Sequence, residues 1–334
     1  MSPVRTAIIG LGYWGPNVLR NFAAQGECAM VLACDRDAAR RERLERQYPS
    51  VRFTADAEEI FTDASIELVL IATPTGTHAP LARRALEAGK HVFVEKPLAA
   101  TVAEAEELVA LAKKQKKLLF VDHTFAFAPA VEKLASLAGS QSLGDLLCFD
   151  SARLNLGLLQ RDANVIEDLA VHDLSILSAI VPLETAQTVL AVGFTHFGKQ
   201  IEEAHMHLTF PRGFHAHIHV SWLSPVKVRR TLLTGAKAMV LYDDAEPSEK
   251  IRVYDKGVER DAAKPDPFFP KYRSGDVVIP ALATVETLSA EAQHVLRCVH
   301  GEEKPRVSGE AGLAVLRILD AANRSIASGS PVAL

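Results

Sequence analysis

Cysteine is scarce in this chain of 334 residues, and no two cysteines have the C-x-x-C spacing. The four that occur are Cys28, Cys34, Cys148 and Cys298, and only the first two lie near each other in the sequence. This usage is typical of free, mostly buried thiols in a reducing compartment. We therefore expect a cytoplasmic protein.

Long apolar runs and an excess of positive charge are also missing. The longest apolar stretches have the length of a strand, too short to cross a bilayer, and residues Met1–Arg5 lack the pattern of a signal peptide. Lys and Arg number 37 against 41 Asp and Glu, a formal net charge of −4. This balance gives no electrostatic reason to expect a nucleic acid or an anionic membrane as a partner. We expect a small molecule instead.

The first 122 residues alternate between short apolar runs and segments with helical spacing. Nearly continuous apolar strands between amphipathic helices are typical of a parallel sheet that helices cover on both faces. The predicted strands are Thr6–Gly10, Ala29–Cys34, Glu67–Ala72, His91–Glu95 and Lys117–Asp122. The pattern predicts a doubly wound α/β domain over residues 1–122.

Residues 123–334 follow a different pattern. Helical spacing comes first, near Pro129–Ala138 and Asp168–Ile180, and segments of strand character then follow in close succession. The predicted strands are Thr188–Phe197, His205–Phe210, Phe214–Trp222, Arg229–Gly235, Met239–Asp243 and Lys250–Tyr254. Short turns between them favour a largely antiparallel sheet, segment 261–278 reads as a long loop, and two helices close the chain. We expect a second, α+β domain over residues 123–334.

A glycine-rich segment, Gly10-Leu11-Gly12-Tyr13-Trp14-Gly15, directly follows the first predicted strand and opens the first helix. In a G-x-G-x-x-G segment the first glycine permits a tight turn, the second lets the backbone approach a pyrophosphate, and the third lets helix and strand pack closely. The helix N-terminus adds amide donors for the phosphates. A purely structural turn is the alternative, but the flanking strand and helix favour dinucleotide binding.

Asp35 ends the second predicted strand, 20 residues after Gly15. A carboxylate at this position accepts hydrogen bonds from ribose hydroxyls and repels a 2′-phosphate, which favours NAD over NADP. The neighbouring Arg36 bears on the choice in the opposite direction, because a guanidinium can accommodate a 2′-phosphate. The sequence predicts NAD as the cofactor.

Two further segments follow predicted strands at the carboxyl edge of the sheet, where doubly wound folds bind ligands. Thr73-Pro74-Thr75 with His78 comes after the third strand and would line the path of the cofactor. Glu95 and Lys96 end the fourth strand. Lys96 is either a solvated surface charge or an amine held against the nicotinamide.

Asp168 and His172 lie four residues apart in a predicted helix. Residues at this spacing share one helix face. A carboxylate beside an imidazole orients the ring and stabilises its protonated form, which suits a general base for an alcohol proton. A pair on a helix surface without a catalytic role is the alternative.

Taken together, these segments resemble the glucose–fructose oxidoreductase/inositol dehydrogenase (Gfo/Idh/MocA) family, in the same order and over essentially the whole chain. The matching motifs are Gly10–Gly15, Ala72-Thr73-Pro74 with His78, Ala88–Val92, Glu95–Ala99 and Asp168–Asp173. The resemblance implies an N-terminal Rossmann domain and a C-terminal α/β domain with an open sheet. It also implies homodimers or homotetramers packed through that sheet, and Lys96, Asp168 and His172 as the catalytic set.

Further motifs resemble the branch of this family that contains nucleotide-sugar 3-dehydrogenases, which oxidise UDP-N-acetylglucosaminuronate and related sugars. These motifs are Gly12–Asn17, Asn155–Gly157, Gln160–Asp162 and His172–Ser175. The chain departs from the branch at Phe127-Ala128, where Tyr-Asn is usual, at Glu167 in place of tryptophan and at Val171 in place of proline. All three departures fall near the expected substrate pocket and so bear on the identity of the sugar.

The resemblance implies a mechanism in which His172, oriented by Asp168, takes the hydroxyl proton as hydride leaves for the nicotinamide. Lys96 donates a hydrogen bond to the developing alkoxide. Asn155 and Arg161 are further candidates for binding substrate, Arg161 through a phosphate or carboxylate. The alternative functions are a dehydrogenase of a free polyol or sugar, such as an inositol, and a cofactor-binding regulator without catalysis. The intact catalytic set argues against the regulator.

Five histidines stand out because no motif includes them. His215, His217 and His219 alternate with apolar residues, so they face one side of a predicted strand. If the turn Pro211–Gly213 closes a hairpin, His207 lies opposite His217 and His205 opposite His219. We expect this face to be a polar subunit interface and expect no metal site, since two facing rings could reach one ion but no further ligand is evident.

Overall fold

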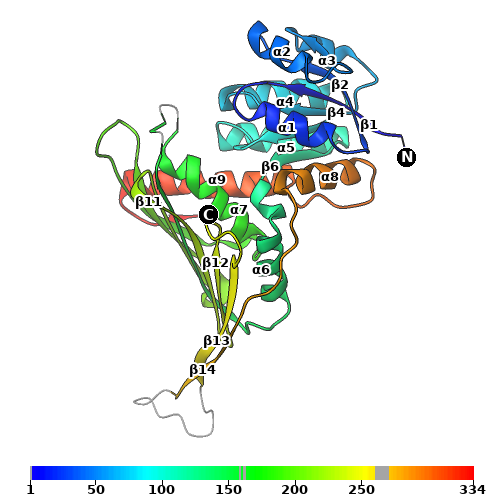
Figure 1. Cartoon of the computed structure of the whole chain (residues 1–334). Helices are drawn as coiled ribbons and strands as arrows, with labels where there is room; N and C mark the ends of the chain where they lie inside the picture. The colour runs from blue at the N-terminus through cyan, green and yellow to red at the C-terminus, as the bar shows by residue number, and fades with distance from the viewer. Residues whose placement is uncertain (1, 158, 161–162, 260–270) are drawn as a thin grey trace. The chain divides into compact units, whose positions relative to one another are not determined.

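The computed structural model describes residues 2–157, 159–160, 163–259 and 271–334 (Figure 1). The chain divides into two compact units, Met1–Phe127 with Val285–Leu316 and Ala128–Thr284 with Arg317–Leu334. The first unit therefore includes a C-terminal segment that a boundary at residue 122 leaves out. The physical reason is the helix α8 (Thr287–Val299), whose buried Leu288, Ala292 and Val295 pack into the same core as the helix α1 (Gly15–Ala23).

The first unit is built on a six-stranded sheet with the strand order β3-β2-β1-β4-β5-β6. Every neighbouring pair is parallel, which confirms the predicted doubly wound sheet. The strands are β1 (Val4–Ile9), β2 (Cys28–Cys34), β3 (Arg52–Thr54), β4 (Leu68–Ile71), β5 (His91–Glu95) and β6 (Leu119–Asp122). The connecting helices are α1, α2 (Ala38–Glu45), α3 (Glu58–Thr62), α4 (His78–Glu87) and α5 (Val102–Gln115). β3 escapes sequence-based prediction because its three residues form no apolar run.

Alternate residues of these strands enter two separate hydrophobic cores, one on each face of the sheet. On β4, Val69 and Ile71 belong to one core, and Leu68 and Leu70 belong to the other. All four side chains are at most 1% exposed. Burial on both faces explains why the strands read as continuous apolar runs rather than as alternating patterns.

The second unit contains a nine-stranded sheet with the order β14-β13-β12-β11-β7-β10-β9-β8-β15. All neighbouring pairs are antiparallel except β10 with β7, so the predicted largely antiparallel sheet is confirmed. The strands are β7 (Leu146–Leu156), β8 (Thr188–Phe194), β9 (Glu203–Thr209), β10 (His215–Ser221), β11 (Leu223–Gly235), β12 (Met239–Asp243), β13 (Ile251–Glu259), β14 (Lys271–Val278) and β15 (Val332–Ala333).

One face of this sheet is apolar and covered, whereas the other is open and carries both polar and apolar side chains. The helices α6 (Pro129–Gly139) and α7 (Val171–Ser178) contact the sheet (Figure 1). The helix α9 (Gly309–Ser328) runs from the first unit into the second. On β9, Ala204 and Met206 are buried, while His205 and His207 on the opposite face are partly or fully exposed. The register places His205 opposite His219 and His207 opposite His217, as predicted.

Three strands of the second sheet, β7, β14 and the two-residue β15, are missing from the sequence-based prediction. Strand β7 lies in the middle of the sheet. Its covered face carries Ser151 and Arg153 beside Phe149, so the sequence lacks the alternation of apolar and polar residues that would predict a strand. Strand β14 lies at the sheet edge and is exposed along nearly its whole length. The predicted loop over residues 261–278 is therefore wrong for residues 271–278, and the rest of that segment lies outside the described residues. Among the helices that the structure describes, none is both long and apolar enough to span a membrane.

Candidate active site

The glycine-rich segment connects β1 to α1 and lies against the end of β4. Gly10 has a positive φ of 98°, and a side chain there would overlap the carbonyl oxygen of Ala72. A side chain at Gly15 would overlap the carbonyl oxygen of Gly10. Close packing within the protein thus requires both glycines. A Cβ atom at Gly12 would meet only the Arg40 side chain, at 3.5 Å, so the backbone there is open to a ligand.

The position of this loop matches the place where doubly wound sheets bind nucleotides. The strand order reverses between β1 and β4, and the Ala72 amide donates to Ile9 O at 2.8 Å where these strands end. The first turn of α1 carries no acidic residue, which leaves the positive end of the helix dipole unneutralised. These features fit the pyrophosphate of a dinucleotide.

Asp35 follows β2 and faces the glycine-rich loop. Its Oδ2 accepts a hydrogen bond from the Leu11 amide at 2.7 Å, and its Oδ1 accepts one from the Asp37 amide at 2.8 Å. A carboxylate has about four lone-pair positions, so both oxygens can still accept from ribose hydroxyls. Arg36 is exposed, and two other guanidinium groups lie beside Asp35. Arg40 Nη1 lies 3.6 Å from Asp35 Oδ2, and Arg41 Nη1 donates a hydrogen bond to the Asp35 backbone oxygen at 2.5 Å. Sequence reasoning missed Arg40 because its approach to Asp35 depends on how the first turn of α2, which begins at Ala38, folds back toward the end of β2.

The other predicted cofactor residues follow β4 and β5. Thr73, Pro74 and Thr75 come shortly after β4. Glu95 is the last residue of β5, and the partly buried Lys96 directly follows it. These positions agree with the predicted carboxyl edge of the sheet. Tyr13, by contrast, is 96% exposed on the glycine-rich loop, which places its ring in solvent.

His78 connects the two segments that follow β4 and β5. Its Nδ1 lies 2.7 Å from Pro97 O and its Nε2 lies 2.7 Å from Thr73 O, and the residue is 1% exposed. Burial lowers the pKa of His78, whereas the two carbonyls oppose this by favouring the protonated ring. Both ring nitrogens are thus engaged by backbone. The ring connects the backbone after β4 to the backbone after β5, and the contact of His78 with the cofactor stays a prediction.

A buried polar cluster, Asp122 with His123 and Glu291, lies where β6 ends, and sequence reasoning missed it. Asp122 Oδ2 accepts a hydrogen bond from Trp14 Nε1 of the glycine-rich loop at 2.7 Å. Glu291 of α8 accepts from the His123 amide at 3.1 Å. Burial lowers the pKa of His123 to about 4, and the positive charge of Lys96 adds to the effect. His123 Nε2 is buried and has no hydrogen-bond partner among the described residues.

Glu291 is fully buried, and burial together with the Asp122 carboxylate raises its pKa well above the ordinary 4.5. The side chain therefore keeps its proton in the folded protein at a pH where the unfolded chain has lost it. Its contribution to stability is complete below pH 4.5 and is lost as the pH rises toward the folded-state pKa. The loss amounts to about 1.4 kcal/mol per pH unit in that interval.

We predict that Glu291→Gln removes this loss, because glutamine is neutral and nearly isosteric. At pH 8 the variant is expected to unfold at a higher denaturant concentration than the parent, and at pH 4 this advantage is absent. Trp14 belongs to the same unit, so its fluorescence in a Trp222→Phe background follows the transition. An equal difference in stability at both pH values would contradict a protonated Glu291.

In the second unit, Asp168 and His172 occupy two kinds of helix. Residues Ile166–Ala170 form a π-helical turn that holds Asp168, and α7, which holds His172, begins at Val171. The predicted continuous α-helix is therefore wrong for this first turn. A π-helical turn widens the helix locally and is frequent at functional sites. Both side chains are half-buried.

Trp222 contacts the predicted site residue Asp168 and was itself not predicted. Its Nε1 donates a hydrogen bond to Asp168 Oδ2 at 3.0 Å, and its backbone oxygen accepts from the Gly157 amide at 3.2 Å. A Cβ atom at Gly157 would lie 2.7 Å from Asn155 Nδ2 and 3.2 Å from Trp222 Cδ1. The indole thus holds Asp168, and Gly157 lacks a side chain where the Asn155 amide and the Trp222 ring both lie close to its backbone. The predicted Arg161 lies outside the described residues.

Glu167 and Val171 are two of the positions at which the chain departs from the nucleotide-sugar branch, and both have a structural role in the second unit. Glu167 Oε2 accepts from the Asn164 amide at 3.1 Å and Oε1 accepts from Asn323 Nδ2 at 3.0 Å. These contacts join the start of the π-helical turn to α9. Val171 is buried. The chain therefore uses both positions to pack the helix that carries His172.

Comparisons with known proteins agree with this geometry. The model of the oxidoreductase family with an NAD-binding Rossmann fold (GFO_IDH_MocA) matches residues 4–123. The model of the C-terminal alpha/beta domain of the same oxidoreductase family matches residues 165–334.

Characterised proteins align along nearly the whole chain. UDP-N-acetylglucosamine 3-dehydrogenase of Acidithiobacillus ferrooxidans is 27% identical over 320 residues, covering 95% of each chain. The scyllo-inositol 2-dehydrogenase (NAD(+)) of Bacillus subtilis is 23% identical and aligns with 99% of this chain and 96% of its own. The crystal structure of GenD2 from gentamicin A biosynthesis, in complex with NAD, superimposes with a TM-score of 0.83 at 22% identity, covering 100% of this chain and 97% of GenD2.

The two family models together account for most of the sequence, in the order of the two folded sheets. The open backbone at Gly12 and the acid at Asp35 fit the NAD-binding fold that the first model describes. The chain belongs to the Gfo/Idh/MocA family of NAD-binding oxidoreductases.

Proposed function

We propose that this protein is an NAD-dependent dehydrogenase that transfers a hydride between the cofactor and a secondary hydroxyl or ketone of a sugar. The observation that carries the proposal is the arrangement at the carboxyl edge of the parallel sheet. There the open backbone at Gly12 and the carboxylate of Asp35 offer a dinucleotide site, and Lys96 ends β5 on the same edge. Sheets of this kind bind ligands at that edge.

C3 of a nucleotide-linked amino sugar or uronate is the proposed site of reaction. The relative from Acidithiobacillus ferrooxidans, which aligns along 95% of the chain, is a UDP-N-acetylglucosamine 3-dehydrogenase and supports this choice. The inositol dehydrogenase relative supports a second candidate, a free polyol or sugar such as an inositol. Both substrates present a secondary alcohol, so one set of catalytic residues serves either.

The proposed mechanism assigns one role to each catalytic side chain. Bound NAD supplies the nicotinamide that accepts or returns the hydride. His172 removes the proton of the reacting hydroxyl as a general base. Asp168, held by the hydrogen bond from Trp222, orients the imidazole. Lys96 donates a hydrogen bond to the oxygen on which negative charge develops. Asn155 and Arg161 are the proposed substrate-binding residues.

A substrate screen tests the proposed function directly. The protein is incubated with NAD and a panel of UDP-linked sugars, UDP-linked uronates, free inositols and free aldoses, and the absorbance of reduced nicotinamide is recorded. We expect turnover with a nucleotide-linked sugar. Turnover confined to free inositols would select the second candidate. A protein that binds NAD but turns over no alcohol in the panel, in either direction, would contradict an enzymatic role.

We predict that the protein binds NAD at least about tenfold more tightly than NADP, a difference of about 1.4 kcal/mol. The cause is repulsion between Asp35 and a 2′-phosphate. Asp35→Ala is expected to bring the two dissociation constants, measured by calorimetry, close together. Arg40→Ala is the matched variant, because it removes a nearby positive charge and should widen the preference. Equal binding of both cofactors by the parent protein would contradict the assignment of Asp35.

The predicted homodimer or homotetramer is a further part of the proposal. The open face of the second sheet exposes Leu190, Val192 and Phe194 on β8, next to the histidines of β9 and β10. These side chains give the face a mixed apolar and polar character that suits a second copy of the chain.

A further inference from the structure

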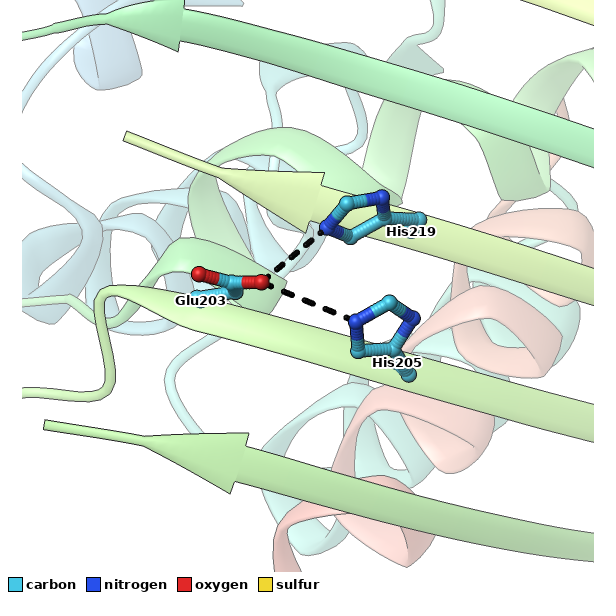
Figure 2. A group of neighbouring side chains, drawn as sticks. All are labelled: Glu203, His205 and His219. Atoms are coloured by element: carbon cyan, nitrogen blue, oxygen red, sulfur yellow. Dashed lines mark ion pairs between the residues drawn. The ribbon is translucent and has the colours of Figure 1, made fainter. Parts of the chain in front are cut away.

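Glu203, His205 and His219 meet at one end of the open face of the second sheet, outside the residues that the proposed dehydrogenase mechanism uses. Glu203 and His205 are two residues apart on β9, and His219 lies directly opposite His205 on β10. Side chains at such positions project from the same face of a sheet. Figure 2 shows both imidazole rings turned toward the carboxylate of Glu203.

The distances between these side chains are those of ligands around one metal ion. Glu203 Oε1 lies 3.4 Å from His219 Nε2 and 3.7 Å from His205 Nε2. Two ligands that each lie ~2.0–2.1 Å from a tetrahedral zinc ion are about 3.3–3.4 Å apart. One ligand atom from each of the three side chains lies within 4.8 Å of the others. Small rotations of the rings would therefore complete the coordination.

One polar atom of the cluster, His219 Nε2, lacks a hydrogen bond of good geometry within the described residues. His219 Nε2 is buried and makes no hydrogen bond with any described residue, although the Glu203 carboxylate is near. The rings of His205 and His219 stack with their centroids 4.0 Å apart and their planes 15° apart. Stacking aligns the two rings so that their nitrogens approach Glu203 together. An imidazole lone pair that faces a carboxylate is repelled by it, and either a proton on that nitrogen or a metal cation between the two groups removes the repulsion.

We propose that Glu203, His205 and His219 bind a divalent transition-metal ion, with Zn²⁺ as the best match. Two imidazole nitrogens and one carboxylate oxygen are a ligand set that zinc accepts, with the fourth position open to water or another ligand. In the single chain the three side chains are between 25% and 40% exposed, so an ion can enter from solvent before a second copy covers this face. The expectation of no metal rested on the lack of a third ligand, and Glu203 provides it. Glu203 went unnoticed because it lies outside the alternating run of histidines.

Among the remaining histidines of this face, His217 stacks on the proposed ligand His205 with ring centroids 5.7 Å apart, whereas His215 has other neighbours and serves as the control. His217 Nδ1 lies 3.1 Å from Asp150 Oδ2, and His215 packs against His207 with ring centroids 5.4 Å apart. His215 is on the same strand and face as His219 but is four residues away. Replacing it changes the number of imidazoles without touching the proposed ligands.

The test uses the full-length, untagged protein after treatment with EDTA and removal of the chelator. Calorimetric titration with Zn²⁺ is expected to give one ion per chain, and Co²⁺ is expected to give the visible absorption of a four- or five-coordinate ion. Glu203→Gln and His219→Gln should each weaken Zn²⁺ binding by at least about 10–100-fold, the loss seen even for outer partners of metal ligands. His215→Gln should bind as the parent does.

Thermal unfolding of each protein with and without Zn²⁺ gives a second readout. An ion that binds only the folded state raises the transition temperature of the parent and of His215→Gln, and this rise is expected to be absent in Glu203→Gln and His219→Gln. The absolute transition temperatures without Zn²⁺ show whether each variant folds. No saturable binding by the parent would overturn the proposal. Equal Zn²⁺ affinity in all four proteins would also overturn it, since binding would then come from other histidines.

Discussion

Lys96→Met and His172→Ala are each expected to lower kcat by roughly 10²–10⁴-fold, the usual scale for the loss of an acid–base group. His172 is proposed to remove the proton, and Lys96 to stabilise the negative charge that develops on the oxygen. Neither role can be taken over by methionine or alanine, which carry no titrating group. Steady-state kinetics with the substrate found in the screen measure the effect.

Two controls make this prediction specific. Lys113→Met removes an exposed lysine of α5 and should leave kcat unchanged. Calorimetry should show that His172→Ala still binds NAD with nearly the affinity of the parent, because His172 belongs to the second unit and the predicted cofactor residues to the first. Near-normal turnover by His172→Ala would mean that another group is the base.

Asp173→Ala is expected to destabilise the second unit by about 3–5 kcal/mol, because it leaves a buried guanidinium without its carboxylate. Arg153 Nε donates to Asp173 Oδ2 at 2.8 Å, and Ser151 Oγ donates to Asp173 Oδ1 at 2.5 Å. The side chains of Arg153 and Asp173 are 4% and 2% exposed. The pair joins α7 to β7, the helix that carries His172 to the strand that carries Asn155.

Denaturant unfolding measured through Trp222 in a Trp14→Phe background follows the second unit alone, since the chain has only these two tryptophans. The double variant Arg153→Met/Asp173→Ala should recover much of the loss, because no buried charge is left unpaired. Asp320→Ala, which breaks an exposed pair with Arg324, should cost less than about 1 kcal/mol. A loss of that small size in Asp173→Ala would show that water reaches Arg153.

The doubly wound sheet and the dinucleotide loop follow from the sequence because their signals are local. A buried parallel strand must be apolar over consecutive residues, and the glycines at positions 10 and 15 are required by backbone atoms close to them in space. The first strand, the glycine-rich segment and Asp35 also lie close together in the sequence, at the spacing of a dinucleotide-binding motif. The histidine register was predictable for the same reason, since a short turn fixes the pairing of two adjacent strands.

Strand β7 shows where the sequence by itself is insufficient. Its covered face contains Arg153, and a buried arginine is recognisable only when its partner Asp173, 20 residues away, is seen beside it. In the same way, α8 contributes Glu291 to a cluster with Asp122 across 169 positions of sequence. No local sequence pattern predicts such a contact, because a charged residue considered alone is expected to be exposed to solvent.

The sequence by itself therefore determined five of the six strands of the first sheet, the cofactor loop and the chemical identity of the candidate catalytic residues. Only the tertiary structure decided that His78 contacts the backbone of two loops, that Trp222 donates a hydrogen bond to Asp168, and that Glu203 lies beside two histidines. The physical reason is that periodicity and turn chemistry act between neighbours in the chain. Hydrogen bonds and ion pairs between buried side chains instead depend on distances that only the packed fold creates.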